Sequence, residues 1–438
     1  MRKLEKKYAN VLAVIGVHSA KFPNEKDTYN LAKAVHRHQI EHPVINDGQF
    51  QIWREYSCRA WPTLMFIDPQ GNVVGKHEGE MSYEDFDGLI SQMVAEYDAQ
   101  GTLDHQPLPS GYRPSEDTTL SFPGKVLADG PGDRLFIADT NHNRIVVTSL
   151  DGALKQVIGS GAEALTDGGF AGCAFNHPQG LALDGETLYV ADTGNHAIRR
   201  VDLAAGVVET IAGTGEQGHT REGRRPGRNM ELCSPYDLLY HQGVIYIAMA
   251  GVHQLWSMDL NDGMIGPFAG TGGEAITDGP LGTAELAQPC GIATDGIKLF
   301  FTDSETSSVR SADIDPAGNV RTVVGLDLFV FGDADGSDHH VRLQHPMGIA
   351  HYDGVLYITD TYNHKIKRVL PATRSAFTVL GKGPPGHVDG AADEAQFSEP
   401  SGISFANGKM YIADTNNHAI RVADIESGVV STLEITGI

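Results

Sequence analysis

The sequence predicts two domains of different class: a small α/β domain over about the first hundred residues, followed by an all-β propeller of six blades. Three observations lead to this prediction. One phrase returns six times over the last three quarters of the chain, the first hundred residues alternate strand and helix patterns, and glycine reaches 51 of 438 residues, which suits many tight turns. A chain of this length is also expected to form more than one core.

The repeated phrase is an apolar strand that ends in aspartate and runs into a polar hairpin. Its six copies are LFIADTNHNRI, LYVADTGNHAI, IYIAMAGVHQL, LFFTDSETSSV, LYITDTYNHKI and MYIADTNNHAI. The anchor positions, at spacings of 53 to 57 residues, are Asp139, Asp192, Met249, Asp303, Asp360 and Asp414. A proline turn precedes each copy, reading Pro-x-Gly in four of them, and a β-branched run such as VVETIAG follows. Each unit is therefore predicted to hold four short strands.

Sheets of four short strands cannot bury both of their faces alone. Radial stacking around one axis covers each sheet with its neighbours, and six lies within the usual four to eight blades. We therefore assign residues 122–438 to the propeller and residues 1–102 to the α/β domain, with residues 103–121 as a polar, proline-bearing linker. The closure of the ring is left open: either residues near Thr118 to Phe122 complete the sixth blade, or the run VVSTLEI completes it unaided.

The Asp-Thr-x-Asn-His phrase falls at the hairpin between the second and third strands. There an aspartate can cap backbone N–H groups, and asparagine or glycine can adopt a positive φ. The phrase resembles the signature of the NHL family, named after Asn-His-Leu, in a variant with isoleucine or leucine after the histidine. NHL propellers serve mainly as platforms for proteins or RNA, and a few relatives are enzymes. We expect a structural role for the signature residues Asp139, Asp192, His196, Asp303, Asp360, His364, Asp414 and His418.

Metal binding is the alternative for these repeated residues, because histidine and aspartate are common ligands. The histidines concerned are His142, His196, His253, His364 and His418. Equivalent residues of separate blades face separate neighbours and do not converge, so we predict neither a metal nor a cofactor. His177 and His345 lie beside turn prolines and could instead face the propeller axis. The acidic run around Asp333, Asp335 and Asp338 lacks a complete calcium loop and is interpreted as a solvated loop.

The connections between repeats are longer than a propeller needs. Insertions at equivalent places cluster on one face, which is often the binding face, so we expect a protein or small-molecule partner there. One of these loops carries Arg221, Arg224, Arg225 and Arg228 and is interpreted as solvated. The third and fourth repeats break the signature at Met249 to Val252 and Ser304 to Ser308, which favours worn copies over specialised ones.

The first hundred residues read as alternating strands and helices. The predicted elements are a strand over Val11–Val17, a helix over Lys26–His38, a short strand at PVIND, a helix over Gln49–Tyr56, a strand over Thr63–Asp68, a hairpin partner at GNVVGKHEG and an amphipathic helix over Ser82–Ala99. This order resembles the thioredoxin-like fold, through Trp61, Pro62 and Thr63 and the Asp-Pro-x-Gly turn that follows the strand. The resemblance implies a cis peptide bond before Pro62, beside a reactive disulfide.

Together with the propeller, the segments IGVHSAKFPNEK and SCRAWPTLMF make nearly the whole chain similar to the family of NHL repeat-containing protein 2. Members of that family carry a CxxC pair just upstream of the stretch that matches Arg2 to Lys7, and this sequence does not contain it. We therefore expect an N-terminally incomplete thioredoxin-like domain, in which a central strand is missing between VLAVIGV and TLMFID.

Thiol–disulfide exchange needs an attacking thiolate and a second, resolving cysteine. The α/β domain holds only Cys58, so Cys58 and Pro62 are weak catalytic candidates. The other cysteines, Cys173, Cys233 and Cys290, show neither close pairing nor metal-ligand spacing, which favours a reducing, cytoplasmic compartment. A net charge of −23 argues against nucleic acid and anionic membranes as partners, and no apolar run is long enough to span a bilayer.

Three functions follow from these observations. The leading hypothesis is an interaction scaffold, whose propeller binds a protein or small ligand beside a thioredoxin-like domain without its CxxC. The first alternative is a thiol–disulfide oxidoreductase in a form extended upstream of Met1. The second is a metal-dependent propeller lactonase or lyase, which only analogy of fold supports.

Overall fold

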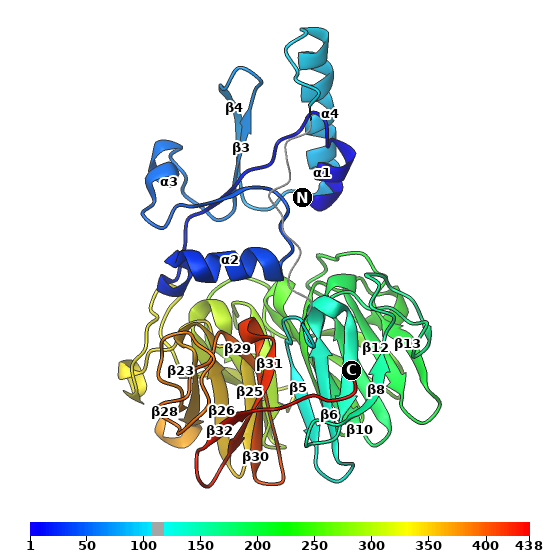
Figure 1. Cartoon of the computed structure of the whole chain (residues 1–438), viewed down its shortest axis with the longest axis vertical. Coiled ribbons are helices and arrows are strands. Elements are labelled where there is room, and N and C mark those ends of the chain that lie inside the picture. The colour runs from blue at the N-terminus through cyan, green and yellow to red at the C-terminus, as the bar shows by residue number, and fades with distance from the viewer. Residues whose placement is uncertain (107–117) are drawn as a thin grey trace. The chain divides into compact units, whose positions relative to one another are not determined.

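The computed structural model describes residues 1–106 and 118–438 (Figure 1). Contacts divide the chain into two compact units, Met1–Glu116 and Asp117–Ile438. The predicted linker, residues 103–121, lies in large part outside the described residues. No helix of the described part is long and apolar enough to cross a membrane.

The C-terminal unit is a six-bladed β-propeller, as predicted (Figure 1). Each blade is an antiparallel sheet whose strands follow chain order, with the first strand innermost. Blade one consists of β5 (Val126–Asp129), β6 (Arg134–Asp139), β7 (Arg144–Thr148) and β8 (Leu154–Ile158). Blade two consists of β10 (Pro178–Asp184), β11 (Thr187–Asp192), β12 (Ala197–Asp202) and β13 (Val207–Ala212). Blade three consists of β15 (Pro235–His241), β16 (Val244–Met249), β17 (Gln254–Asp259) and β18 (Met264–Ala269).

The remaining blades repeat this order. Blade four consists of β20 (Pro289–Thr294), β21 (Lys298–Asp303), β22 (Ser308–Asp313) and β23 (Asn319–Val324). Blade five consists of β25 (Gly348–Tyr352), β26 (Val355–Asp360), β27 (Lys365–Leu370) and β28 (Ser375–Leu380). Blade six consists of β29 (Pro400–Ala406), β30 (Lys409–Asp414), β31 (Ala419–Asp424) and β32 (Val430–Thr432). Short outer strands from the inter-repeat loops extend blades two to five, namely β9 (Gly168–Gly169), β14 (Arg225–Pro226), β19 (Gly279–Pro280) and β24 (Gly336–Ser337).

The core of the propeller lies between the blades. Six apolar clusters form it, and each joins two neighbouring blades. Strand β6 shows the reason: Leu135 and Ile137 pack toward blade six, while Phe136 and Ala138 pack toward blade two. Because successive side chains of a strand point to opposite faces, an all-apolar second strand requires a neighbour on both sides. A closed ring meets that requirement for every blade.

The ring closes by the second of the two expected routes, in which the run VVSTLEI completes blade six. Strand β32 completes blade six from the blade's own sequence, and Ser121 enters blade one, where its N–H donates to Asp139 Oδ1 at 2.6 Å. The C-terminal segment then crosses to blade one. There the Leu154 N–H donates to the Thr436 carbonyl at 3.0 Å, and the Thr436 N–H donates to the Gly152 carbonyl at 3.1 Å. The tail thereby covers the outer strand β8.

The N-terminal unit combines helices and strands, as predicted. Its helices are α1 (Arg2–Lys7), α2 (Thr28–Arg37), α3 (Gln51–Glu55) and α4 (Tyr83–Ala99). Its strands form a parallel pair, β1 (Gly16–His18) with β2 (Val44–Asn46), and an antiparallel pair, β3 (Thr63–Ile67) with β4 (Val73–Glu78). The expected strand over Val11–Val17 is wrong in length, because β1 begins only at Gly16. Two separate pairs of strands do not make the single sheet of a thioredoxin-like fold, so that fold is not shown.

Candidate functional site

A buried aspartate ends the second strand of five blades. Asp139, Asp192, Asp303, Asp360 and Asp414 are all fully buried. In blade two, Asp192 Oδ1 accepts the Asn176 N–H at 2.7 Å, and Oδ2 accepts the Asn195 side-chain amide at 2.9 Å. Burial raises the pKa of Asp192 to about 6, and the cation and hydrogen bonds around it oppose that rise. The signature aspartate therefore stabilises the hairpin and has no access to solvent.

A buried cation lies seven residues after the aspartate in four of these blades. The cations are Arg199, Arg310, Lys367 and Arg421, and all four are fully buried. Arg199 donates to Asp192 Oδ2 at 2.7 Å and to Asp167 Oδ1 at 3.1 Å. Asp167 lies in the preceding inter-repeat loop and also accepts the Thr210 hydroxyl at 2.7 Å. This relay connects the hairpin, the loop and the outer strand of one blade.

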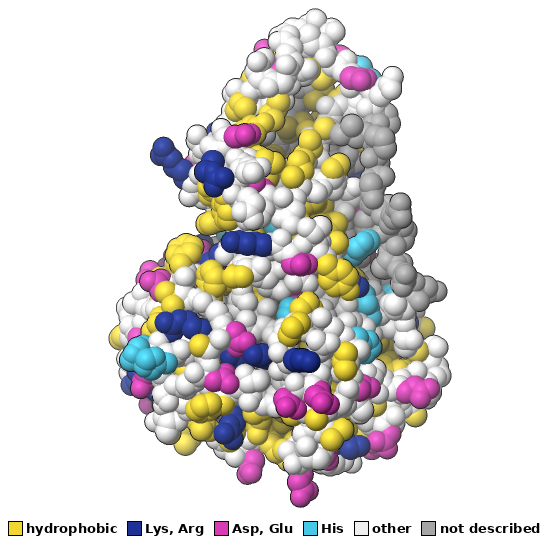
Figure 2. Space-filling model, turned by 60° about the vertical axis from the view of Figure 1, so that its left-hand side comes forward, with side chains coloured by type: hydrophobic (Ala, Val, Ile, Leu, Met, Phe, Trp, Pro, Cys, Tyr) yellow, Lys and Arg dark blue, Asp and Glu magenta, His cyan; other side chains and the backbone are white. Residues whose placement is uncertain are grey.

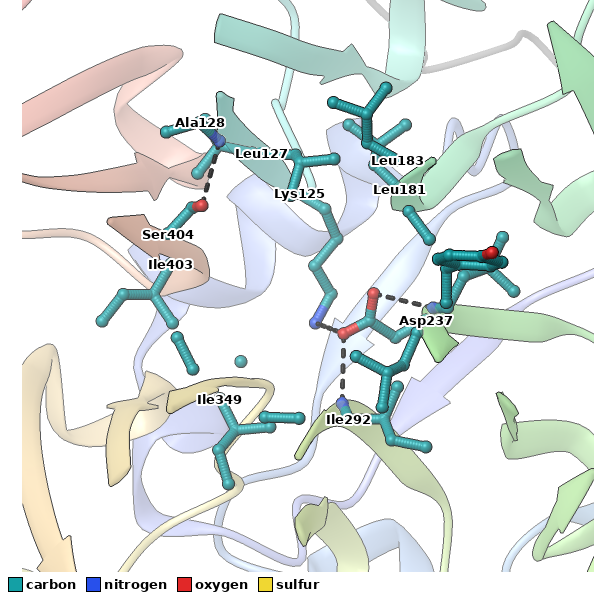
Figure 3. A pocket seen from close by; sticks show the side chains of 18 of the residues that line it. Lys125, Leu127, Ala128, Leu181, Leu183, Asp237, Ile292, Ile349, Ile403 and Ser404 are labelled. Carbon is teal, nitrogen blue, oxygen red and sulfur yellow. Dashed lines mark hydrogen bonds and ion pairs between the residues drawn. The ribbon is translucent and has the colours of Figure 1, made fainter. Parts of the chain in front are cut away.

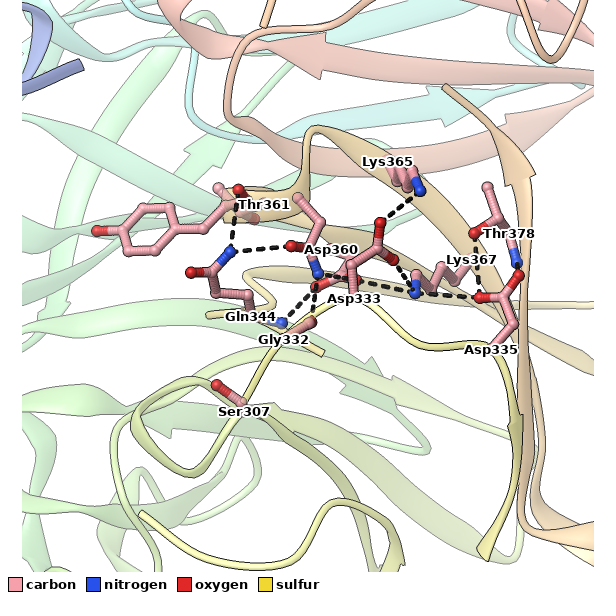
Figure 4. A network of polar contacts seen from close by, with 12 residues as sticks. Ser307, Gly332, Asp333, Asp335, Gln344, Asp360, Thr361, Lys365, Lys367 and Thr378 are labelled. Carbon is pink, nitrogen blue, oxygen red and sulfur yellow. Dashed lines mark hydrogen bonds and ion pairs between the residues drawn. The ribbon is translucent and has the colours of Figure 1, made fainter. Parts of the chain in front are cut away.

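The same relay returns in blades four, five and six, and Figure 4 shows the blade-five copy. There Lys367 donates to Asp333 at 2.7 Å and to Asp335 at 3.1 Å, and Asp335 accepts the Thr378 hydroxyl at 3.1 Å. Asp333 and Asp335 are exposed, as the interpretation of this acidic run as a solvated loop predicted, and they also bind the buried Lys367. The sequence signal for these partners was an Asp-Gly dipeptide in the inter-repeat loops, at Asp167, Asp278, Asp335 and Asp389.

Blade three replaces both members of the ion pair together. Met249 stands at the aspartate position and Trp256 at the arginine position, and both are buried. The Trp256 indole N–H donates to Gln254 Oε1 at 3.0 Å, so its polar atom is satisfied. Blade four keeps the pair, with Arg310 at 3.0 Å from Asp303. The departures at Ser304 to Ser308 therefore leave the ion pair of blade four intact, and the change in blade three is compensated.

The signature histidines form the joints between blades. In each hairpin the residue after the 3₁₀ turn has a positive φ, between 48° and 55°, and it accepts an N–H from the next blade. His196 Nδ1 accepts the Ser234 N–H at 3.0 Å, and His364 Nδ1 accepts the Glu399 N–H at 3.0 Å. In four blades the positive φ thus belongs to the histidine, whereas in blades one and four it belongs to Asn143 and Ser307.

The joint that closes the ring uses an N–H acceptor, as every joint does, and a hydroxyl-to-carbonyl bond, which the joints of blades one, two, four and five also have. The Thr415 hydroxyl donates to the Pro123 carbonyl at 2.8 Å, and His418 Nδ1 accepts the Phe122 N–H at 3.2 Å. In blades one and four, Asn143 and Ser307 take the histidine's place as acceptors. Each acceptor thus faces a different neighbouring blade. Over residues 1–106 and 118–438 no three His, Cys, Asp or Glu side chains gather closely enough to hold a metal ion.

Neither His177 nor His345 lines the propeller axis. Both stand at joints with a positive φ, where His177 Nδ1 lies 2.7 Å from Asn176 Oδ1, and His345 stacks on Tyr362. The arginine-rich loop, by contrast, is exposed at Arg221, Arg224, Arg225 and Arg228, as expected. Figure 2 shows acidic and basic side chains interspersed over the propeller surface.

The propeller axis holds a cavity of about 350 Å³ (Figure 3). The innermost strands of all six blades line it. One aliphatic residue from each blade surrounds it at the same level, namely Val126, Leu181, Leu238, Ile292, Ile349 and Ile403. The walls run from Lys125 and Asp237 to Asp129, Thr294 and His351 at the ends of the strands. The mouth therefore lies at the end of the axis opposite the signature hairpins and the inter-repeat loops.

A buried ion pair closes the inner end of the cavity. Lys125 and Asp237 are only 4 % and 8 % exposed, and Lys125 Nζ lies 3.3 Å from Asp237 Oδ2. Lys125 also donates to the carbonyls of Cys290, at 2.9 Å, and Met347, at 2.8 Å. It thereby connects blade one to blades three, four and five across the axis. Burial raises the pKa of Asp237, and Lys125 opposes the rise.

Glycine explains why only these two positions carry side chains. In the other four blades the second residue after the turn proline is glycine, because a Cβ there would meet the next blade. At Gly180 it would lie 2.4 Å from Asp237 Cα, and at Gly348 it would lie 2.3 Å from the Ser401 carbonyl oxygen. Lys125 and Asp237 are the two departures from Pro-x-Gly. The departure from Pro-x-Gly in these two repeats is the sequence signal for the buried ion pair, which the sequence analysis did not predict.

In the N-terminal unit the Trp61–Pro62 peptide bond is cis, as expected. Cys58 precedes this turn, is half-buried and forms no disulfide. The ring centroids of Trp53 and Trp61 lie 4.6 Å apart, and Trp61 is 49 % exposed. The structure brings no second thiol of this unit near Cys58, because the unit has only one cysteine.

Comparisons with known proteins agree with this architecture. The model of the NHL repeat matches residues 175–200, which form the signature hairpin of blade two. SUPPRESSOR OF QUENCHING 1 of Arabidopsis thaliana, a chloroplastic protein, is 42 % identical over 460 residues, covering 99 % of this chain and 44 % of that protein. NHL repeat-containing protein 2 of Gallus gallus is 38 % identical over 476 residues, covering 99 % of this chain and 65 % of that protein. The chain thus spans about half to two thirds of these relatives.

The repeat match and six equivalent blades make the chain an NHL-repeat β-propeller protein. It is homologous over nearly its whole length to NHL repeat-containing protein 2. Among solved structures, a chain of a nidogen–laminin complex is similar at a TM-score of 0.46 and 16 % identity, covering 69 % of this chain and 92 % of that one.

The substitution Arg199→Met tests the buried relay. It leaves the Asp192 carboxylate buried without its cation, so we expect a loss of about 3–5 kcal/mol in the free energy of unfolding. The double substitution Asp192→Met with Arg199→Trp copies Met249 and Trp256 of blade three and leaves no buried charge. We expect the double variant to unfold at a higher temperature than Arg199→Met in scanning calorimetry. An equal or larger loss in the double variant would contradict the role of charge compensation.

A second prediction concerns pH. Burial lowers the pKa of His364 to about 4, so Nδ1 stays unprotonated at neutral pH and accepts the Glu399 N–H. Between pH 4 and the unfolded value of 6.5 the unfolded state binds more protons at this residue, so its contribution to stability is complete above pH 6.5 and is lost as the pH falls toward 4.

The substitution His364→Asn introduces the acceptor that blade one uses and removes this titration. We expect the stability difference between wild type and variant to increase by about 3 kcal/mol from pH 4 to pH 6.5 in denaturant titrations. The exposed His340→Asn provides the control and should give a flat difference. A flat difference for His364→Asn as well would rule out the proposed joint chemistry.

Proposed function

We propose that the chain is a binding platform whose propeller holds a protein segment or small ligand at the axial cavity. The observation that carries this proposal is the half-enclosed cavity of about 350 Å³, which lies at the small end of ligand pockets. The signature residues give a second argument for this proposal, because their polar atoms already form the hydrogen bonds of the hairpins and of the joints between blades. They make the ring rigid and leave a concave surface at the axis.

The mouth of the cavity opens on the face opposite the inter-repeat loops, so the proposed binding face is that one. Our sequence-based expectation placed the partner on the loop face, but those loops supply Asp167, Asp278, Asp335 and Asp389 as exposed partners of the buried cations. Their length thus has a structural cause, which weakens the case for a binding role. A cytoplasmic, reducing location remains part of the proposal and is supported by four free cysteines.

The binding face can be tested with two variants of the full chain. His351→Trp narrows the mouth, and Arg225→Glu changes an exposed loop residue. We expect compounds and peptides that raise the unfolding temperature of the wild type, in a screen of metabolites and short peptides, to lose that effect in His351→Trp and keep it in Arg225→Glu. The reverse pattern would move the site to the loop face, and a screen without any stabilising compound would refute the platform.

A thiol–disulfide oxidoreductase in a longer form is the second candidate. It is supported by homology to proteins that extend well beyond this chain. A metal-dependent lactonase or lyase gains no such support, because aliphatic side chains and a closed ion pair surround the axis.

The chain of 438 residues should not catalyse the reduction of insulin by dithiothreitol, because Cys58 has no resolving partner in its unit. Turbidity should develop at the same rate with wild type and with Cys58→Ser. A rate that exceeds the Cys58→Ser rate would show that Cys58 reacts with a thiol elsewhere. A longer form carrying an in-frame CxxC should catalyse the reaction, and inactivity of that form would refute the oxidoreductase proposal.

A further inference from the structure

The walls of the axial cavity are edge strands with free backbone groups. In an antiparallel pair, alternate residues turn both their N–H and C=O away from the partner strand. In β10 the hairpin pairs Asp184 with Thr187, so Leu183 and Leu181 are the residues that face away from β11. The same alternation applies at the equivalent positions of the innermost strands of the other blades. Two residues of every innermost strand therefore direct a donor and an acceptor at the axis.

Three bonds confirm this orientation. The Ile292 N–H donates to Asp237 Oδ2 at 3.2 Å, the Leu238 N–H donates to Asp237 Oδ1 at 3.0 Å, and the Ala128 N–H donates to Ser404 Oγ at 2.9 Å (Figure 3). All three donors belong to the set that the register directs at the axis. Buried backbone groups almost always have partners, so the rest of this set requires bound water or a ligand inside the cavity.

The cavity lining is electrically balanced. Asp237 is paired with Lys125 at 3.3 Å, and Asp129 at the mouth is paired with Arg134 at 2.8 Å. A charged ligand would therefore bring an uncompensated charge into a half-enclosed site, which costs several kcal/mol. Hydroxyl groups fit better, because each one donates and accepts a hydrogen bond and can meet the alternating N–H and C=O groups. The six aliphatic side chains that surround the cavity, from Val126 to Ile403, can contact the C–H faces of a ligand.

We propose that the axial cavity binds a neutral polyhydroxy compound of monosaccharide size. This inference rests on the proposed function and narrows it to one ligand class. The main-chain edges of the six innermost strands bind the hydroxyl groups, and the Lys125–Asp237 pair forms the floor of the site. Ligand size follows from the volume of about 350 Å³, which suits one sugar ring within the cavity.

The test measures binding of defined probes to the full chain by isothermal titration calorimetry and saturation-transfer NMR. The neutral probes are D-glucose, D-galactose, N-acetylglucosamine and myo-inositol. D-glucuronate and glucose 6-phosphate are the charged counterparts of equal ring size. We expect at least one neutral probe to bind saturably with a 1:1 ratio, and its charged counterpart to bind at least about tenfold more weakly.

Two tryptophan substitutions on the same face locate the site. His351→Trp should weaken binding of the neutral probe at least about tenfold, because it fills the mouth. Ile297→Trp adds the same bulk at a residue that is 74 % exposed and outside the cavity, so binding should change less than about twofold. The circular dichroism of both variants should match the wild type, and a misfolded His351→Trp is replaced by Thr294→Trp at the same rim.

Each contrary result has a distinct meaning. Equal affinity for neutral and charged probes, or unchanged binding in both rim variants, overturns the neutral-polyol site. Binding of other compounds at the mouth, with no response to polyols, also overturns it but leaves the platform function standing. No saturable binding of any probe or library compound means that the cavity holds water only, and both proposals then fail.

Discussion

A carboxylate without access to solvent is the constraint on which the propeller depends. The second strand of each blade is apolar on both faces, and in five blades it ends in a fully buried aspartate. Such a charge is tolerated only with hydrogen bonds and a counter-charge. Arg199 supplies the counter-charge in blade two, and it needs a further acceptor, which Asp167 of the inter-repeat loop provides. The long loops follow from this chain of requirements.

Compensation also explains the exceptions in the repeats. Blade three has lost the aspartate, and with it the arginine, because an unpaired guanidinium in the same place would be as costly as an unpaired carboxylate. In blade one the counter-charge for Asp139 is Arg144, whose Nε lies 2.7 Å from Asp139 Oδ2. Arg144 is nearer to its aspartate in the sequence than the cations of the other blades are. The residues at the aspartate position and at the cation position of a blade are therefore expected to change together. Single signature residues are poor indicators of which blade has a specialised role.

The periodic features of the fold were predictable from the sequence and the pairwise features were not. Six blades, four strands in each and the cis bond at Pro62 followed from repeated patterns and a resemblance. The relay through Asp335 and the pair of Lys125 with Asp237 join residues on different elements, and a pattern within one repeat contains no information on which elements meet. The strand predicted over Val11–Val17 failed for a related reason, since an apolar run does not show whether a partner strand is present.

The axial cavity arises from the same close packing that excludes side chains next to it. Glycine at Gly180, Gly291, Gly348 and Gly402 lets neighbouring blades approach at the inner end of the axis, where a Cβ would collide. Farther along the axis, the cavity lies between the innermost strands of the six blades. The two residues that replace glycine do not fill this space, because Lys125 and Asp237 bind each other and the backbone of blades four and five. A rigid ring with main-chain groups facing an electroneutral cavity is consequently suited to binding without any conformational change of the blades, since the hydrogen-bonding groups are already oriented before a ligand enters.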